Sequence, residues 1–142
     1  MIGFNPKPKP DRENVLYYTS GINPYATISI DPVPAPRMTR SDKWKKRPNV
    51  VRYFAFRNEL ILKSNLVNLT LPNVLNVLFV IKMPDSWTEK KRNQMKYKPH
   101  QQKPDRDNLL KSVQDAFNID DAFVWDGRTT KIWGEVGQII FY

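Results

Sequence analysis

The chain has 142 residues and no cysteine, and its 23 Lys and Arg against 14 Asp and Glu give a formal net charge of +9. This length suits one compact domain, and the absence of cysteine excludes disulfides and thiolate metal sites. The charge attracts polyanions, so nucleic acid is the first candidate partner and an anionic membrane surface the second; the plain alternative is a basic protein with neither partner.

Residues 1–25 are expected to form an irregular basic arm ahead of a single domain over residues 26–142. The prolines that break the start of the chain are not typical of a signal peptide. The longest apolar stretch, Val77–Ile81, is far too short to span a bilayer. We therefore expect a soluble, cytoplasmic protein.

The first regular elements are a strand and a helix separated by a proline-rich loop. Alternating apolar and polar residues predict a strand over Ala26–Ile30. Three prolines then exclude regular structure from Asp31–Arg40. Pro48 is expected to begin an amphipathic helix of about four turns. Its apolar side should hold Val50, Tyr53, Phe54, Leu60 and Ile61.

The middle of the chain predicts a buried strand and a short basic helix. The continuous apolar run Asn73–Ile81, between two prolines, is typical of a central strand. Ser86 is a natural N-cap, and Glu89 three residues later completes a capping box. The helix should then extend from Trp87 to about Met95.

The last third predicts a helix over Asn108–Phe117 and two strands, roughly Val124–Trp133 and Gln138–Tyr142, with glycines in the turn between them. Strands and helices in this order predict an α+β fold, in which helices pack on a mixed β-sheet.

Two acidic pairs stand out in this basic chain. Asp105 and Asp107 precede the third helix, and in an extended segment residues two apart point the same way. Two such carboxylates suit Mg²⁺. Lys111 follows one helical turn later. The alternative is that the acids cap the helix and that Lys111 forms an exposed ion pair with Asp107 or Asp115.

The second pair, Asp120 and Asp121, lies where the third helix gives way to a strand, and the alternative interpretation is a simple turn. A site that received carboxylates from both pairs within a basic protein would be typical of metal-dependent phosphodiester cleavage. The carboxylates would hold the metal and the basic surface would hold the DNA backbone.

A basic loop precedes the first helix. The loop spans Arg37–Arg47 and holds six Lys and Arg residues with Trp44 among them. Basic side chains around an aromatic one suit phosphate contacts and base stacking. A solvated loop is an equally good interpretation. Together with Lys103, the expected DNA-binding residues are Arg37, Arg40, Lys43, Trp44, Lys45, Lys46 and Arg47. We expect the lysines around the second helix to be only a solvated face.

His100, the only histidine, lies in a polar loop and is expected to be exposed, with contact to phosphate as the alternative. There is no glycine-rich phosphate loop, which excludes nucleotide hydrolysis of the P-loop type.

Three segments resemble one known family. KPDRDNLLK resembles the KPDxDNLxK segment of the RusA family of Holliday junction resolvases, and DDAFVWDGRTTK resembles its DDxxV segment with the following strand. PRMTRSDKWKKRP resembles the basic loop of phage and prophage members. The resemblance covers roughly residues 26–142. Phe123 departs from it, standing where the DDxQV form has a polar residue.

The resemblance implies a homodimeric α+β endonuclease that cuts four-way DNA junctions with Mg²⁺, for which Mn²⁺ is expected to substitute. Carried over by position, Asp105, Asp107 and Asp121 would be the essential, metal-binding carboxylates and Lys111 the essential lysine. Two alternatives stay open: a basic nucleic-acid-binding module without activity, and a nuclease that acts on flaps or other DNA.

Overall fold

The computed structural model describes residues 21–37 and 47–142. Within these residues the chain forms one α+β domain with a mixed sheet, as predicted. The elements are β1 (Ala26–Ser29), α2 (Pro48–Leu66), β2 (Val77–Lys82), α3 (Glu89–Met95), α4 (Arg106–Ala116), β3 (Thr129–Gly134) and β4 (Gln138–Phe141). None of the helices described is long and apolar enough to cross a membrane.

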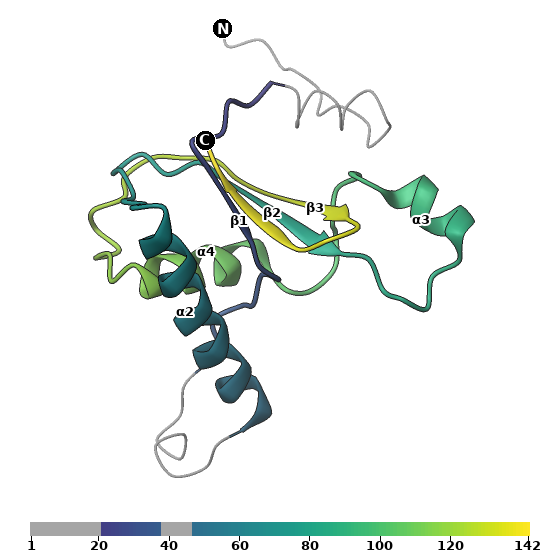
Figure 1. Ribbon diagram of the computed structural model, residues 1–142, viewed down its shortest axis with the longest axis horizontal. Coiled ribbons are helices and arrows are strands. Elements are labelled where there is room, and N and C mark those ends of the chain that lie inside the picture. The colour runs from purple at the N-terminus through teal and green to yellow at the C-terminus, as the bar shows by residue number, and fades with distance from the viewer. Residues whose placement is uncertain (1–20, 38–46) are drawn as a thin grey trace, which may run out of the picture.

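The four strands form one sheet in the order β1-β4-β2-β3 (Figure 1). β2 runs parallel to β3, with Val77 opposite Thr129, and antiparallel to β4, with Val77 opposite Phe141. The parallel pair needs a long crossover, which contains both α3 and α4. β2 therefore lies inside the sheet, which explains why its sequence is a continuous apolar run.

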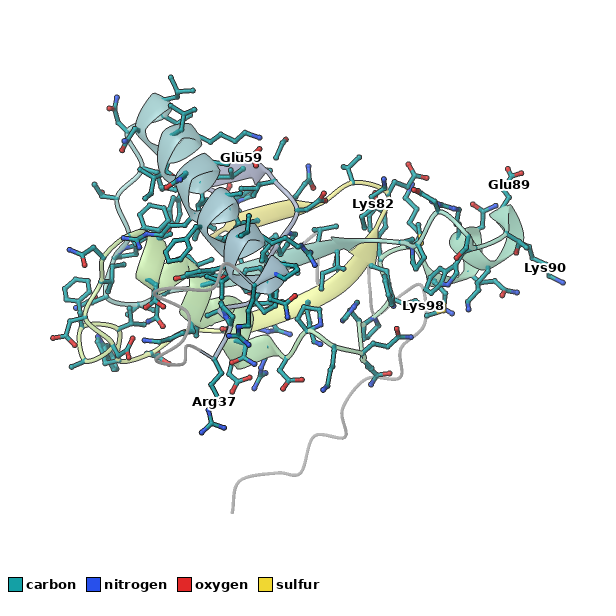
Figure 2. The ribbon with its side chains drawn as sticks, turned by 90° about the horizontal axis from the view of Figure 1, so that it is seen from below. Arg37, Glu59, Lys82, Glu89, Lys90 and Lys98 are labelled. Atoms are coloured by element: carbon teal, nitrogen blue, oxygen red, sulfur yellow. The ribbon has the colours of Figure 1, made fainter. Side chains whose placement is uncertain are left out.

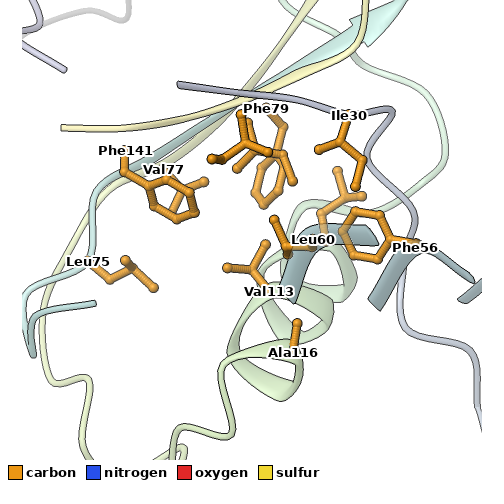
Figure 3. Close-up of a cluster of buried hydrophobic side chains, with 12 residues drawn as sticks. Ile30, Phe56, Leu60, Leu75, Val77, Phe79, Val113, Ala116 and Phe141 are labelled. Carbon is orange, nitrogen blue, oxygen red and sulfur yellow. The ribbon is translucent and has the colours of Figure 1, made fainter. Parts of the chain in front are cut away.

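Helices α2 and α4 cover one face of the sheet, whereas α3 projects beyond the end of the sheet (Figure 1). The main core fills the space between these helices and the strands (Figure 3). Leu60 of α2 and Val113 of α4 are fully buried there against Val77 and Phe79 of β2. This packing fixes α4, and with it the acidic segment that precedes it, against the sheet.

The other face of the sheet carries a smaller apolar cluster, in which Ile22 packs against Leu78, Val80 and Ile132. The backbone N–H of Tyr25 donates to the carbonyl of Phe141 at 2.9 Å. Residues 21–25, the end of the expected N-terminal arm, therefore contact the sheet. The rest of that arm, residues 1–20, lies outside the described residues.

Two predicted strands begin later than expected, and one predicted helix face was partly wrong. β2 starts at Val77 rather than Asn73, and β3 at Thr129 rather than Val124. In α2, Phe54 is 41% exposed, and Phe56 and Ser64 are buried with Val50, Tyr53 and Leu60. α2 covers the sheet on one side and contacts α4 on another, so its buried stripe differs from a simple apolar wheel.

The predicted start of α3 was also wrong. The helix begins at Glu89, and its N-cap is Thr88, whose side chain accepts a hydrogen bond from the Lys91 N–H. Ser86 lies two residues too early to cap it. Trp87 instead packs against Trp133 of β3, with ring centroids 4.7 Å apart and the ring planes tilted by 55°, and this contact anchors the base of the α3 projection.

Candidate active site

The first acidic pair lies at the start of α4. α4 begins at Arg106, two residues before the predicted start, so Asp105 is its N-cap and Asp107 belongs to its first turn. Asp105 has extended backbone (φ −69°, ψ 146°) and makes no capping hydrogen bond with its side chain. Asp105 therefore has the extended backbone expected from the sequence, whereas Asp107 is helical. Asp105 lines a cavity, described below, to whose lining Asp107 does not contribute.

Lys111 connects α4 to the second acidic pair. Its ammonium lies 3.0 Å from Asp121 Oδ2, 3.3 Å from Asp121 Oδ1 and 3.2 Å from Asp115 Oδ1. The hydrogen bonds to Asp121, followed by those to Asp115, raise the pKa of Lys111. The ion-pair alternative foresaw the contact with Asp115, one turn away. It did not foresee the contact with Asp121, which brings the second acidic pair to the polar face of α4.

The two acids of the second pair have different environments. Asp120 accepts a hydrogen bond from the Ala122 N–H at 3.0 Å, and its carbonyl accepts from the Phe123 N–H at 2.9 Å. Asp120 thus makes the turn that its sequence suggested. Asp121 instead directs its carboxylate to Lys111.

The end of the same loop is held by backbone contacts to the segment before β2. The Asp126 carbonyl accepts from the Leu75 N–H at 2.9 Å. Gly127 has φ +146° and approaches so closely that a Cβ there would lie 1.9 Å from the Leu75 carbonyl oxygen. Only glycine suits this position. The loop that carries Asp121 is therefore anchored at both ends, by the Lys111 contact and by this backbone pairing.

Sequence reasoning missed a further member of the polar cluster on α4. The Tyr53 hydroxyl of α2 donates to Asp115 Oδ2 at 3.3 Å. Burial and the charge of Asp115 raise the pKa of Tyr53, so its hydroxyl stays protonated. Tyr53, Asp115, Lys111 and Asp121 form one chain of contacts. The available signal was a tyrosine on the apolar face of α2, because a buried hydroxyl needs a partner.

The cavity that Asp105 lines has a volume of about 750 Å³ and lies between the α3–α4 connection and β3. Its basic residues are Lys103, Arg106, Arg128 and Lys131. The Lys131 ammonium donates to the backbone carbonyls of Gln102 and Pro104. Desolvation lowers the pKa of Lys131, and the nearby Asp105 carboxylate opposes that shift. Lys131 thus ties the segment before Asp105 to β3.

His100 is buried, contrary to the expected exposed loop position. It is 4% exposed, its ring centroid lies 4.2 Å from that of Trp133, and its backbone N–H donates to the Lys131 carbonyl at 3.0 Å. Nδ1 is buried without a hydrogen-bond partner. Desolvation, followed by the charge of Lys131, lowers the pKa of His100 to about 4, so its ring is neutral near pH 7.

The expected DNA-binding loop is only partly described. Arg37 is exposed and points away from the body of the domain (Figure 2), and its carbonyl accepts a hydrogen bond from Arg47 at 3.0 Å. This bond closes the base of the loop. Lys103 is exposed at the rim of the cavity. Five of the predicted contacts lie outside the described residues: Arg40, Lys43, Trp44, Lys45 and Lys46.

The acidic side chains have the donor chemistry of a hard-cation site. Asp105, Asp107 and Asp121 are all exposed, so their carboxylate oxygens are accessible, and such oxygens are the ligands that Mg²⁺ prefers. Across residues 21–37 and 47–142, no three His, Asp or Glu side chains gather closely enough to form a ready-made metal site. The three aspartates therefore supply the oxygen donors that Mg²⁺ needs, and the Lys111 ammonium lies beside one of them, Asp121.

Comparison with known proteins identifies the family. The model of the family described as endodeoxyribonuclease RusA matches residues 30–140, which is most of the chain and includes both acidic pairs. No individual curated protein matches the chain. The matched region begins directly after β1, includes α2, β2, α3, α4 and β3, and ends within β4. The chain therefore belongs to the RusA family of endodeoxyribonucleases.

Proposed function

We propose that this protein is a Mg²⁺-dependent endonuclease that resolves four-way DNA junctions by paired, symmetric nicks in recombination and repair. The observation that carries the proposal is the contact of Lys111 with Asp121, because it joins the two acidic motifs of a RusA-family chain. The +9 net charge supports DNA as the substrate.

Asp105, Asp107 and Asp121 would hold the metal. When bound, Mg²⁺, or Mn²⁺ in its place, lowers the pKa of a water molecule and polarises the scissile phosphate. Lys111 keeps its positive charge, because its carboxylate partners raise its pKa. It can therefore stabilise the negative charge that develops on the phosphate. Asp115 and Tyr53 orient Lys111 from the side of α2.

A homodimer would match the substrate. A four-way junction has approximate two-fold symmetry, and a C₂ dimer presents two identical sites to it. Each site would then cut one of two equivalent strands. The junction arms would be held through phosphate contacts by the basic residues of the loop from Arg37 to Arg47 and by Lys103.

A comparison of labelled four-way, flap and linear DNA, each with and without Mg²⁺, tests the proposal. Faster cleavage of the four-way junction, only with Mg²⁺, is the expected result. Binding without cleavage of any substrate would favour the basic binding module. Preferred cleavage of the flap or the linear duplex would keep the nuclease and reject the junction as its substrate.

A further inference from the structure

The cavity beside Asp105 has the charge and lining of an anion site. Four of the residues that line it are Lys or Arg, and Asp105 is the single acid among them. Amide and hydroxyl side chains of Gln101, Gln102, Thr129 and Thr130 line it as well, together with Pro99, His100 and Ile132. An apolar ligand is disfavoured here, because binding it would bury five charged side chains against an apolar surface. The lining suits a phosphodiester, whose oxygens accept bonds from guanidinium, ammonium and amide groups.

Part of this positive charge is fixed in place. Lys131 extends from the middle of β3 and is held by the carbonyls of Gln102 and Pro104, so its position does not depend on a ligand. Arg106, by contrast, is exposed, and within residues 21–37 and 47–142 its side chain makes a single, long hydrogen bond of 3.4 Å to the Thr129 carbonyl. A phosphate oxygen in the cavity could replace that weak bond with a stronger, charge-assisted one.

The location of the cavity decides which phosphate it would bind. Asp105 lines the cavity, whereas Lys111, Asp115 and Asp121 meet on the polar face of α4 outside its lining. A strand whose scissile phosphate lies at the carboxylates would therefore continue into the cavity. Without a bound cation, the carboxylates would repel the scissile phosphate. The four basic residues of the cavity would attract the next phosphate along the strand and so offset that repulsion.

We propose that the cavity between the α3–α4 connection and β3 binds a phosphate of the cleaved DNA strand next to the scissile one, with Arg106 as its principal donor. This inference rests on the proposed function for the identity of the strand. It adds Arg106, Arg128 and Lys131 to the DNA-contacting residues expected from the sequence.

The test is a binding experiment that needs no cleavage. Four-way junctions that carry one uncharged methylphosphonate at successive positions around the branch point are titrated in EDTA against the wild-type protein and Arg106→Gln. The matched control is Lys90→Gln, because Lys90 is an exposed cation on the projecting helix α3 (Figure 2) and does not line the cavity. Circular dichroism verifies that each variant is folded.

One or two methylphosphonate positions should weaken wild-type binding about tenfold, as expected for a lost charge-assisted bond. Arg106→Gln should weaken binding to the unmodified junction to a similar degree. At the same positions it should show no further loss, since the contact is already gone. Lys90→Gln should show the wild-type pattern.

The inference would be overturned if Arg106→Gln bound the junction no worse than Lys90→Gln. It would also be overturned if the loss from Arg106→Gln multiplied with the loss from the methylphosphonate at every position. Both results are distinct from failure of the proposed function, in which wild-type protein binds the unmodified junction and leaves it uncut after Mg²⁺ is added. The phosphate contact would then stand as part of a binding module.

Discussion

The Lys111 ammonium lies 3.0 Å from Asp121 Oδ2, although the two residues are separated by the end of α4 and a turn. The contact places one positive charge between the polar face of the helix that follows the first acidic pair and the loop that carries the second. The proposed mechanism gives both residues a chemical role, and tests can separate that role from an ordinary surface ion pair.

Lys111→Ala should abolish cleavage, with a fall of at least about 100-fold, the cost of losing one group that stabilises transition-state charge. Junction binding should change little, because Lys111 is one of 23 basic residues. Lys63→Ala is the matched control, since Lys63 also pairs with a carboxylate one turn away, Glu59 at 2.8 Å. Equal cleavage rates for the two variants would return Lys111 to the role of a surface pair.

Asp121→Asn should lose cleavage and keep or tighten junction binding, because the substitution removes a charge that repels phosphate. Asp126→Asn is the matched control and should retain most activity, since the described role of Asp126 is a backbone bond to Leu75. Asp120→Asn tests the acid that forms the turn. Rates measured on one junction decide the matter. An inactive Asp126→Asn beside an active Asp121→Asn would mean that the second motif has been assigned to the wrong carboxylate.

The protein should be a homodimer in solution, and this expectation comes from the symmetry of the junction and the family resemblance. Light scattering measures the mass directly, both for the free protein and for the junction complex. A dimer mass in both states is expected. A monomer mass in both would contradict the paired-nick mechanism, because a single site cannot cut two equivalent strands at once.

The buried His100 should make stability depend on pH. Its pKa is about 4 in the folded protein and about 6.5 in an unfolded chain. Between these values the unfolded chain binds the proton more readily. The contribution of the neutral His100 ring to the free energy of unfolding is therefore complete above pH 6.5. It is lost as the pH falls toward 4, by at most about 1.4 kcal/mol per pH unit.

Denaturant unfolding of the wild type and of His100→Leu between pH 7 and pH 4 measures this effect. The leucine variant should lose less stability with acid, because its side chain does not titrate. Parallel stability curves for the two proteins would show that His100 is not buried as a neutral ring.

Sequence patterns predicted the elements better than their ends. The proline at the start of α2 and the apolar run of β2 identified both elements. The starts of the other two helices were displaced, because Thr88 rather than Ser86 caps α3 and α4 begins two residues early, at Arg106. The choice between two capping residues two positions apart depends on how the chain packs, here on the contact of Trp87 with Trp133, and local spacing does not contain that information.

The acids and the lysine of the candidate site were proposed from the sequence, and their role stays a prediction; the contacts between them were not foreseen. Family resemblance indicated Asp105, Asp107, Lys111 and Asp121. The contacts of Lys111 with Asp121 and of Tyr53 with Asp115 depend on tertiary packing. The burial of His100 is of the same kind, because it results from pairing of its loop with β3, which a polar loop sequence does not indicate.

The central claim is metal-dependent resolution of a branched junction, and strand mapping on one substrate tests it most directly. A four-way junction is prepared with each strand labelled in turn and incubated with the protein in Mg²⁺ or in excess EDTA. The account predicts nicks at symmetric positions in two opposite strands with Mg²⁺ and intact strands with EDTA. Full cleavage in EDTA, or no cleavage of any strand in Mg²⁺, would contradict it.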